Sequence, residues 1–150
     1  MTTTAPATSM INFRPMMRNQ KRSAWRKVHY DNAVKIVLVF ETPFWEKLGY
    51  VGGKIISDSP LRATFFPSHE YESGVGVLLA SYVWGDDANL WTAYSDEQAV
   101  DKALEEVVKI LGDEAKTQFL EGRVKNWLKD DLSMGAYCWL LPHQQVQENP

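Results

Sequence analysis

The sequence contains a single cysteine, Cys138, in 150 residues. One cysteine cannot form a disulfide within the chain, and it excludes iron–sulfur and zinc sites that need several thiolates. The three histidines, His29, His69 and His143, are far apart and show no metal-ligand spacing. We therefore expect no metal site, and we take the cytoplasm as the expected compartment.

Long hydrophobic runs and an excess of positive charge are also missing. The longest apolar run without a charge, residues 75–84, is about half as long as a helix that spans a bilayer. The first residues do not show the charged and apolar regions of a secretory signal. Sixteen Lys and Arg against 19 Asp and Glu give a net charge of −3. We expect neither a membrane nor a nucleic acid as a partner, because nucleic-acid binding usually depends on a broad positive field.

Nucleotide-binding loops are absent as well, although the chain has nine glycines. The only G-x-G is Gly74–Gly76, and Leu79 stands where the dinucleotide fingerprint needs its third glycine. Asp86 and Asp87 are adjacent, so their carboxylates point apart in regular structure, and we expect them in a solvated turn or at a helix start. Generic motifs therefore leave the function open.

The composition is that of a single globular domain, with 45% hydrophobic and 23% charged residues. Short runs rich in Val, Ile and Phe predict strands, which lie at residues 33–40, 51–58, 62–66 and 74–84. The first of them is almost wholly apolar, which favours a strand buried on both faces. Residues 21–29 can form two helical turns.

One helix has clear boundaries. Ser95 and Gln98 form a capping box, apolar pairs recur at helical spacing from Ala99 to Leu111, and Gly112 stands at a C-cap position. A shorter helix is predicted over residues 113–120. Strands followed by helices indicate the α+β class.

Lys35 is unusual because it lies inside the apolar strand run. A lysine taken out of water loses its charge readily, and such lysines are used in catalysis. The alternative is that Lys35 lies at the strand end and extends its amine to solvent. The residues alone favour the second interpretation.

Several sequence blocks, in their order and spacing, resemble flavin-containing amine oxidases, specifically the L-amino-acid oxidase branch. The resemblance extends from Ile11 over about nine tenths of the chain. The blocks are KIVLVFETPFWEKLGYVGG at 35–53, DSPLR at 58–62, FPSH at 66–69, LASYVWGDDA at 79–88, VKNW at 124–127, SMGAY at 133–137 and Pro142.

This resemblance implies a role for four residues. Lys35 corresponds to the strand lysine that holds a water beside the flavin, where the substrate is oxidised. Tyr82 corresponds to a tyrosine that helps to bind the substrate carboxylate, with a register uncertain by one residue. Trp127 matches a tryptophan near the flavin ring, and Tyr137 matches a position in the substrate pocket. For the three aromatic residues, packing in the core is the alternative.

The resemblance also implies the cofactor and the organisation of the chain. Ala136 stands where monoamine oxidases carry the cysteine that bonds to FAD, so we expect non-covalent FAD. Cys138 is expected to serve packing. The implied fold is a mixed β-sheet with helices on one side. We expect a flexible leader at 1–10, part of a substrate-binding domain at 11–142 and a tail at 143–150 that begins a further flavin-contacting segment.

The glycine-rich segment that binds the FAD pyrophosphate in this family is not in the sequence, so we expect FAD to be held mainly by another region or chain. The first hypothesis is thus a part of an FAD-dependent L-amino-acid oxidase that uses oxygen and needs the FAD-binding remainder as its partner. The alternative is a non-catalytic α+β binding or assembly domain, or a relic of such an oxidase. An amine substrate instead of an amino acid is disfavoured by the resemblance.

Overall fold

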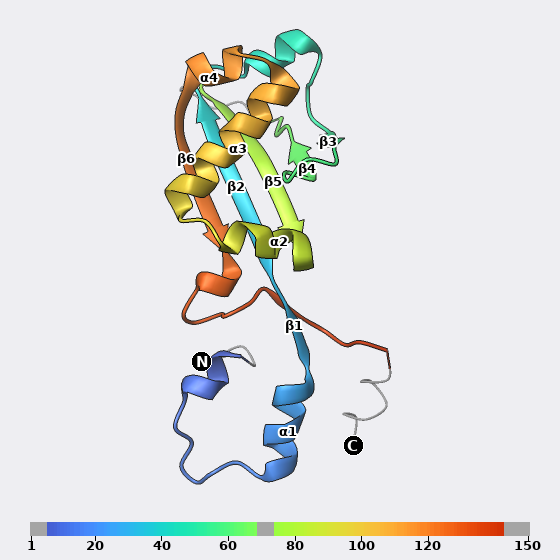
Figure 1. The fold of residues 1–150 in the computed structure, drawn as a ribbon, viewed down its shortest axis with the longest axis vertical. Coiled ribbons are helices and arrows are strands. Elements are labelled where there is room, and N and C mark those ends of the chain that lie inside the picture. The colour runs from blue at the N-terminus through green and yellow to red at the C-terminus, as the bar shows by residue number, and fades with distance from the viewer. Residues whose placement is uncertain (1–5, 69–73, 143–150) are drawn as a thin grey trace. The chain divides into compact units, whose positions relative to one another are not determined.

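The computed structural model describes residues 6–68 and 74–142. The chain divides into two compact units (Figure 1). The larger unit is Val34–Asn126, and the smaller combines the chain up to Ala33 with the chain from Trp127 onward. Residues 1–5 of the expected leader, His69, and the expected tail at 143–150 with His143 lie outside the described residues.

The larger unit is built on a five-stranded sheet with the order β3-β4-β5-β2-β6. The pairs β2–β6, β3–β4 and β4–β5 are antiparallel, and β2 and β5 also run in opposite directions in Figure 1. The α+β class is confirmed, with antiparallel neighbours throughout the described sheet. The strands are β2 (Ala33–Phe40), β3 (Lys54–Ile56), β4 (Ala63–Phe65), β5 (Gly76–Trp84) and β6 (Phe119–Asn126).

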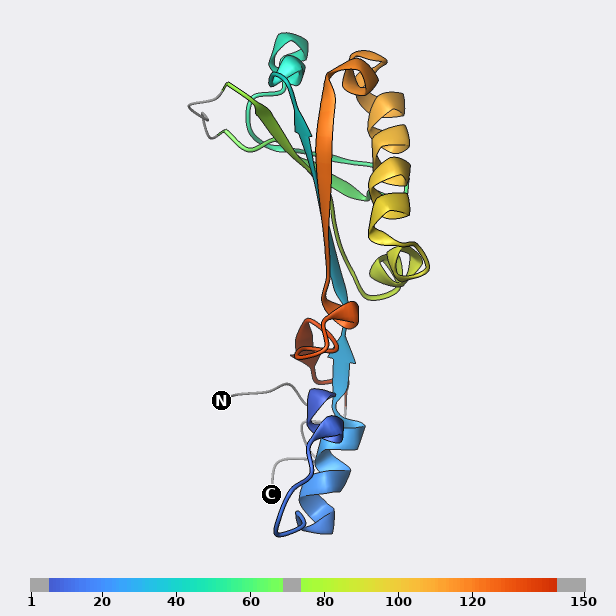
Figure 2. The same cartoon turned by 90° about the vertical axis from the view of Figure 1, so that its left-hand side faces the viewer.

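Helices cover one face of this sheet, as expected. Figure 2 shows α3 and α2 on the same side of β2, β5 and β6. Under them lie the buried side chains of β2, among them Ile36, Leu38 and Phe40. The helices are α2 (Gly85–Thr92), α3 (Asp96–Leu111) and α4 (Glu114–Gln118), and a short 3-10 helix, η2 (Phe44–Leu48), follows β2.

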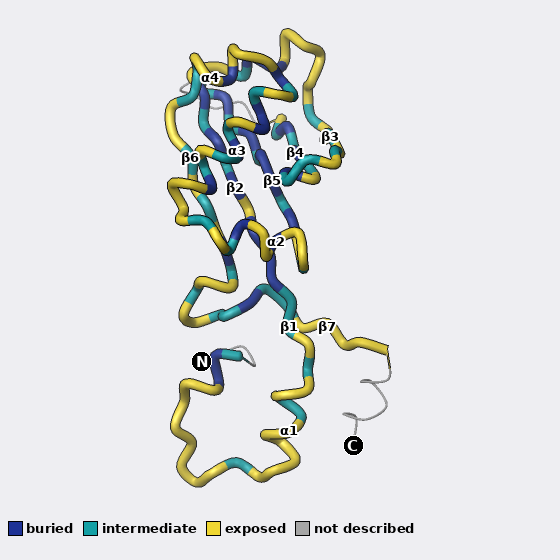
Figure 3. The backbone as a smooth tube through the Cα atoms, in the orientation of Figure 1, coloured by how far each residue is buried: buried dark blue, intermediate teal, exposed yellow. Residues whose placement is uncertain are grey.

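The opposite face of the sheet is open within the larger unit. Along β2, Lys35 is exposed and Val37 and Val39 are half-buried, while the residues between them are buried. Figure 3 shows this alternation of burial along β2. The expectation that β2 is buried on both faces is therefore wrong. The strand is wholly apolar apart from Lys35, but its neighbours are antiparallel, and antiparallel sheets commonly leave one face uncovered.

The capping signals place α3 correctly. The Ser95 hydroxyl accepts a hydrogen bond from the Gln98 backbone N–H at 3.2 Å, and the Gln98 side chain accepts one from the Ser95 N–H at 3.0 Å. Gly112 at the C-terminus has a φ of 90°, a conformation that suits glycine. The buried stripe includes Ala99, Ala103 and Val107. The apolar periodicity therefore identified the face that packs on the sheet.

Strand β6 was not predicted. The expected helix over 113–120 ends at Gln118 in α4, and the chain continues into β6. Polar residues alternate with Gly122 and Val124 in β6, so its apolar signal is weak. Pairing with β2, rather than local preference, makes this segment a strand.

The smaller unit contains a two-stranded antiparallel ladder of β1 (His29–Asp31) and β7 (Tyr137–Trp139). Its helices are α1 (Asn19–Lys27) and two 3-10 helices, η1 (Ala7–Met10) and η3 (Trp127–Lys129). Cys138 in β7 is exposed, so the expectation that its sulfur packs in a core is wrong. No helix in the described residues is long and apolar enough to cross a membrane.

Candidate functional site

Lys35 and Tyr82 lie together on the open face of the sheet. Lys35 is the third residue of β2, Tyr82 is in the neighbouring strand β5, and the Lys35 Nζ is 4.5 Å from the centroid of the Tyr82 ring. An ammonium at this distance is attracted by the negative face of the ring. The structure thus brings together two of the four residues implied by the resemblance.

An irregularity in β5 places Tyr82 on this face. Leu78 and Ala80 are buried, and the next buried residues are Ser81 and Val83, so the alternation shifts by one residue at Ala80–Ser81. Without the shift, Tyr82 would point with Leu78 toward the helices, because strand side chains alternate between faces. The shift therefore places Tyr82 on the face opposite to the helices.

Two side-chain hydrogen bonds accompany the shift. The Thr64 hydroxyl donates to the Ala80 carbonyl at 2.8 Å, and the Ser81 hydroxyl donates to the Leu61 carbonyl at 3.0 Å. Thr64, Ala80, Ser81 and Leu61 are all buried. Because a buried polar group without a partner is costly, these bonds hold the irregular part of β5 in place.

On the open face, other cationic side chains lie next to Lys35. In the register of β2 and β6, Lys35 is directly opposite Lys125, and Val37 is opposite Arg123. Arg123 forms an exposed ion pair with Glu121, with Nη2 3.1 Å from Oε2. The side chains of Lys35, Lys125 and Arg123 are exposed in the described structure. The face therefore combines half-buried valines with cationic side chains.

The exposure of Lys35 corrects one step of the sequence argument. Its neighbours along the chain, Val34 and Ile36, are fully buried, but they point to the other face of the strand. The apolar run around Lys35 therefore does not take its amine out of water in this chain. This exposure agrees with the alternative interpretation that Lys35 extends its amine to solvent, and Lys35, the third residue of β2, lies with its amine above the Tyr82 ring.

Trp127 and Tyr137 belong to the smaller unit. Trp127 begins η3, Tyr137 begins β7, and both are half-buried. The Trp127 carbonyl accepts a hydrogen bond from the Gly135 N–H at 2.9 Å, which closes the segment between them into a loop. The two residues are thereby positioned by the same stretch of chain.

Asp31 and Asn32 fix this loop, and sequence analysis did not identify either of them. The Asp31 carbonyl accepts from the Ala136 N–H at 2.8 Å, and the buried Asn32 Oδ1 accepts from the Leu128 N–H at 3.1 Å. The Tyr137 hydroxyl donates to Asp31 Oδ2 at 3.3 Å. These partners are about 100 residues away in the chain, so no local motif could reveal them.

Gly135 is needed for the close approach of the loop to β1. Its φ is 144°, and a Cβ on this residue would collide with the ring of Tyr30. Any other residue would therefore displace the loop that carries Trp127 and Tyr137. The close approach of Tyr30 therefore explains why a glycine occupies this position of the block SMGAY.

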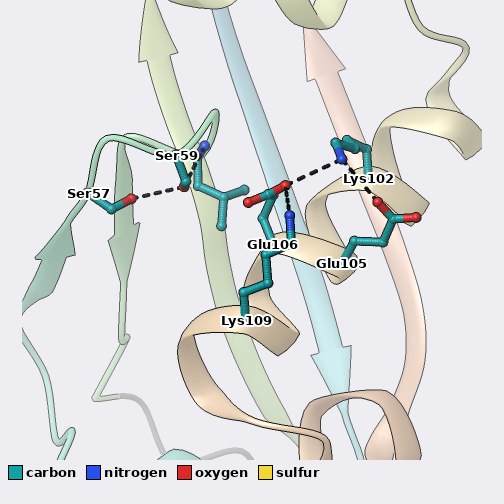
Figure 4. Close-up of polar contacts among 7 residues, drawn as sticks. Ser57, Ser59, Lys102, Glu105, Glu106 and Lys109 are labelled. Carbon is teal, nitrogen blue, oxygen red and sulfur yellow. Dashed lines mark hydrogen bonds and ion pairs between the residues drawn. The ribbon is translucent and has the colours of Figure 1, made fainter.

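The charged cluster with shifted pKa values lies elsewhere, on α3 (Figure 4). Glu106 Oε1 is 2.7 Å from Lys109 Nζ and 3.3 Å from Lys102 Nζ, and the Glu106 side chain is only 8% exposed. The hydrogen bond from Lys109 lowers the pKa of Glu106, burial opposes this effect, and Lys102 adds to it. Hydrogen bonds to Glu105 and Glu106 raise the pKa of Lys102. The cluster joins successive turns of one helix, so it stabilises α3.

Asp86 and Asp87 lie in the first turn of α2, where carboxylates are favourable near the helix N-terminus. Arg62 pairs with Asp87, with Nη2 2.9 Å from Oδ1. This arrangement agrees with the structural role expected for the pair. No cluster of His, Cys, Asp and Glu suited to a metal is found among the described residues.

Among the described residues, each unit has a surface cavity. The one in the smaller unit has a volume of about 640 Å³ and is lined by residues that include Phe13, Trp25 and Arg26. The other, of about 400 Å³, lies beside Trp45 and Val77 in the larger unit. None of the four predicted site residues lines either of these two cavities.

A flavin fits the described residues only in part. The open face offers an amine and aromatic side chains, which suit the flat ring system of a flavin. The pyrophosphate needs backbone N–H groups at a glycine-rich helix start. The one G-x-G, at Gly74–Gly76, leads into strand β5 instead. Lys35 and Tyr82 supply an amine and an aromatic ring on one face of the larger unit, and the described residues offer no such cradle for the FAD phosphates.

Comparison with known proteins identifies the family. The model of the family "Flavin containing amine oxidoreductase" matches residues 1–147. An L-amino-acid oxidase of Siganus canaliculatus is 43% identical over 148 residues, which are 97% of this chain and 28% of that protein. An L-amino-acid oxidase of Gloydius halys is 34% identical over 145 residues, 95% of this chain and 29% of that protein.

Solved structures agree on the fold. A putrescine oxidase variant from a redesign of cofactor binding matches with a TM-score of 0.73 at 20% identity, covering 91% of this chain and 30% of that one. Cyclohexylamine oxidase from Brevibacterium oxydans matches with a TM-score of 0.66 at 16% identity, covering 89% and 29%. The chain thus spans less than a third of the length of these relatives. It belongs to the flavin-containing amine oxidoreductase family.

Proposed function

We propose that this chain is the main substrate-binding part of an FAD-dependent L-amino-acid oxidase. Such an enzyme converts an L-amino acid, oxygen and water to a 2-oxo acid, ammonia and hydrogen peroxide. The observation that carries the proposal is the 43% identity to an L-amino-acid oxidase over 97% of the chain. The pairing of Lys35 with Tyr82 on an open sheet face supports it.

Lys35 has the role of holding a water molecule beside the reacting carbon of the substrate. The Tyr82 ring fixes the position of the Lys35 amine, at 4.5 Å from its centroid. An ammonium has three hydrogen-bond donors, so Lys35 can contact the ring and orient a water at the same time. When the FAD-binding remainder covers the open face, bulk water is excluded, and the water that Lys35 orients is the one that remains beside the substrate.

Tyr82 donates its hydroxyl to the substrate carboxylate, while its ring remains against Lys35. Phenol groups suit this role because one end packs and the other donates a hydrogen bond. Tyr137 lines the pocket for the substrate side chain, and Trp127 contacts the flavin ring. The hydrogen bonds from Gly135 and to Asp31 and Asn32 keep these two aromatic residues in place.

FAD, when bound, would supply the acceptor for the hydride equivalent, the two electrons and proton of the substrate Cα–H bond. We propose that it is bound without a covalent link, because Ala136 stands at the position of the linking cysteine in monoamine oxidases. Cys138 is exposed two residues further along and belongs to β7. The FAD-binding remainder, as a further segment or a separate chain, is the proposed partner.

The first experiment is to purify the protein from its own source and record its native mass and visible spectrum. A yellow complex that reacts with L-amino acids and forms hydrogen peroxide supports the proposal. A colourless chain of 17.1 kDa without a partner contradicts it and favours the non-catalytic alternative. Reduction of the flavin by amines but not by amino acids would contradict the choice of substrate.

The cytoplasm is the proposed compartment. Its support is the exposed free thiol of Cys138, which a reducing compartment keeps from forming disulfides between molecules. Labelling with a thiol reagent in intact and in lysed cells tests this point. Labelling of Cys138 by an impermeant reagent in intact cells would place the chain outside.

A further inference from the structure

The shift in the alternation of β5 lies between two side-chain hydrogen bonds. Just before it, the Ala80 carbonyl accepts from the Thr64 hydroxyl at 2.8 Å. Just after it, the Ser81 hydroxyl donates to the Leu61 carbonyl at 3.0 Å. Tyr82 is the next residue, so both bonds act on the backbone within two residues of its ring.

Both bonds are closed to water. Thr64 is 2% exposed, and Ala80, Ser81 and Leu61 are fully buried. A buried carbonyl that loses its donor is left with a desolvation cost that water cannot offset. The two bonds therefore resist a displacement of this part of β5 more strongly than exposed bonds would.

The turn before β4, which carries Leu61, is itself fixed to α2. The Trp91 Nε1–H donates to the Pro60 carbonyl at 3.3 Å. Arg62 pairs with Asp87, with Nη2 2.9 Å from Oδ1. Because α2 follows β5 directly in the chain, the turn is tied to the element that begins where β5 ends.

We infer that Thr64 and Ser81 are positioning residues for the amine and the phenol on the open face. Their hydrogen bonds hold the shift that turns Tyr82 to the same side as Lys35. The inference rests on the proposed function, in which Tyr82 binds the substrate carboxylate and Lys35 orients a water. Both hydroxyls are buried, so they act through the backbone of β5 and not by contact with the substrate.

The physical reason is that a regular strand would continue its alternation and place Tyr82 on the side of the helices. Strand irregularities re-aim side chains beside functional sites, but they disrupt the local backbone ladder. Here two side-chain donors supply hydrogen bonds at the irregular step. Without them, the backbone at Ala80–Ser81 can relax, and the phenol ring is the first group to move relative to Lys35.

The first part of the experiment uses NMR of the chain and needs no activity. A proton held above an aromatic ring is shifted upfield, so the ε-methylene protons of Lys35 report the position of the Tyr82 ring. We expect this upfield shift in the wild type, because Lys35 Nζ is 4.5 Å from the ring centroid. Thr64→Val keeps the shape of the side chain without its hydroxyl, and Ser81→Ala removes the other hydroxyl. Both variants should lose much of the shift.

Two further variants separate positioning from stability. Thr64→Ser keeps the donor and should keep the upfield shift of Lys35. Ser95→Ala is the matched control, because it removes a hydroxyl that caps α3 and destabilises the chain away from β5. It should leave the Lys35 resonance unchanged.

Two results would overturn the inference. One is a wild type without the upfield shift of Lys35. The other is an unchanged shift in Thr64→Val and Ser81→Ala together with a loss of stability, which would give the hydroxyls a structural role only. If one of these variants does not fold, the other variant and the wild-type shift decide.

The second part uses the flavin-loaded oxidase that contains this chain. The probe is phenylpropanoate, a carboxylate that has no amine to oxidise. We expect Thr64→Val to weaken its binding by about tenfold, the scale of a weakened hydrogen bond to a charged group, while FAD stays bound. Thr64→Ser should bind the probe as the wild type does.

The two parts distinguish this inference from the proposed function. If Thr64→Val moves the ring but Tyr82→Phe leaves the binding of phenylpropanoate unaltered, the role proposed for Tyr82 fails and the positioning by Thr64 stands. If the ring and the binding of the probe are unchanged in Thr64→Val and Ser81→Ala, the positioning inference fails and the proposed function is unaffected.

Discussion

Lys35 and Lys125 are direct partners across the antiparallel pair β2–β6, with both side chains on the open face of the sheet. Like charges in this position are unfavourable by several tenths of a kcal/mol. The Tyr82 ring on the other side of Lys35 offsets part of this cost, because an ammonium above an exposed ring gains about 0.5–1 kcal/mol. The chain therefore holds Lys35 between a repelling and an attracting neighbour.

Lys35→Met tests the proposed role of this amine. We expect flavin reduction in the FAD-loaded oxidase to slow by roughly 10²–10⁴-fold, the scale of a lost acid–base or water-orienting group, while FAD stays bound. Stopped-flow spectroscopy measures the rate, and the visible spectrum reports the bound flavin.

Lys54→Met is the matched control for Lys35→Met. Lys54 Nζ also lies over an aromatic ring, 5.8 Å from the centroid of Phe65, but in strand β3 at the sheet edge. Its replacement should leave the reduction rate unchanged. Equal rates in wild type and Lys35→Met would rule out the proposed role.

Tyr82→Phe tests carboxylate binding separately from packing. The ring stays above Lys35 and near Trp84, whose ring centroid is 5.4 Å away, so only the hydroxyl is lost. We expect substrate binding to weaken by about 1–3 kcal/mol, the scale of a hydrogen bond to a charged group. Titration with a non-reacting carboxylate inhibitor measures it. Tyr50→Phe, on the ring stacked against Phe66, is the control, and an unaltered affinity in Tyr82→Phe would leave Tyr82 a packing role only.

Glu106→Gln tests the charged cluster on α3 through its pH dependence. Lys109 and Lys102 hold the pKa of Glu106 below its ordinary value of 4.5 in the folded protein. A lowered folded pKa gives stability that is present above 4.5 and is lost as the pH falls through the lower folded value. We expect the variant to lose about 1 kcal/mol at neutral pH, a modest value because Lys109 is solvent-exposed and its charge is screened.

Urea unfolding of wild type and Glu106→Gln from neutral to acidic pH measures this difference. The two free energies of unfolding should converge below the folded pKa of Glu106, where the carboxyl is neutral in both states. Glu105→Gln is the control, because Glu105 is 64% exposed and should contribute little. A difference that persists unchanged at acidic pH would contradict the electrostatic origin.

Gly122→Ala tests how closely β6 packs against α3. A Cβ at Gly122 would lie 2.5 Å from Val100 Cγ1 and 2.9 Å from Leu38 Cδ2. We expect a loss of about 1–3 kcal/mol from overpacking, measured by thermal or urea unfolding. Both obstacles are side chains, so adding Val100→Ala should restore part of the stability. If Gly122→Ala is as stable as the wild type, β6 and α3 are not in close contact there.

Gly76→Ala gives the contrasting case. There the new Cβ would lie 2.5 Å from the Thr42 carbonyl oxygen, which is backbone and cannot be removed by substitution. Shortening a neighbouring side chain should therefore not restore the stability of this variant.

The parts of the fold that the sequence predicted are those with strong local signals. The capping box at Ser95, the apolar pairs of α3 and the β-branched run of β2 each determine their own conformation. Strand β6 has no such signal and forms only because β2 is beside it. The open face was missed for the same reason, since the composition of a strand does not show which of its faces a neighbour covers.

The candidate site also contains residues that the sequence could predict and residues that it could not. Lys35 could be predicted because its charge lies inside an apolar run, and Tyr82 because it lies in the block at 79–88 that resembles the family. Their contact could not be predicted, because it depends on the shift in burial at Ala80–Ser81. Asp31 and Asn32 carry no mark in the sequence. Their partners, Tyr137 and Leu128, are brought to them only by the β1–β7 ladder and the loop before it.

The open face of the sheet also has a consequence for how copies of the chain behave in solution. Lys35, Lys125 and Arg123 stand among the half-buried valines of this face. Two copies stacked through it would bring their cations together while water is squeezed out, which is costly. The same charges favour a counterpart of opposite sign. Along β2 and β6 these three cations outnumber the one carboxylate on this face, Glu121, so stacking of two copies through it is disfavoured.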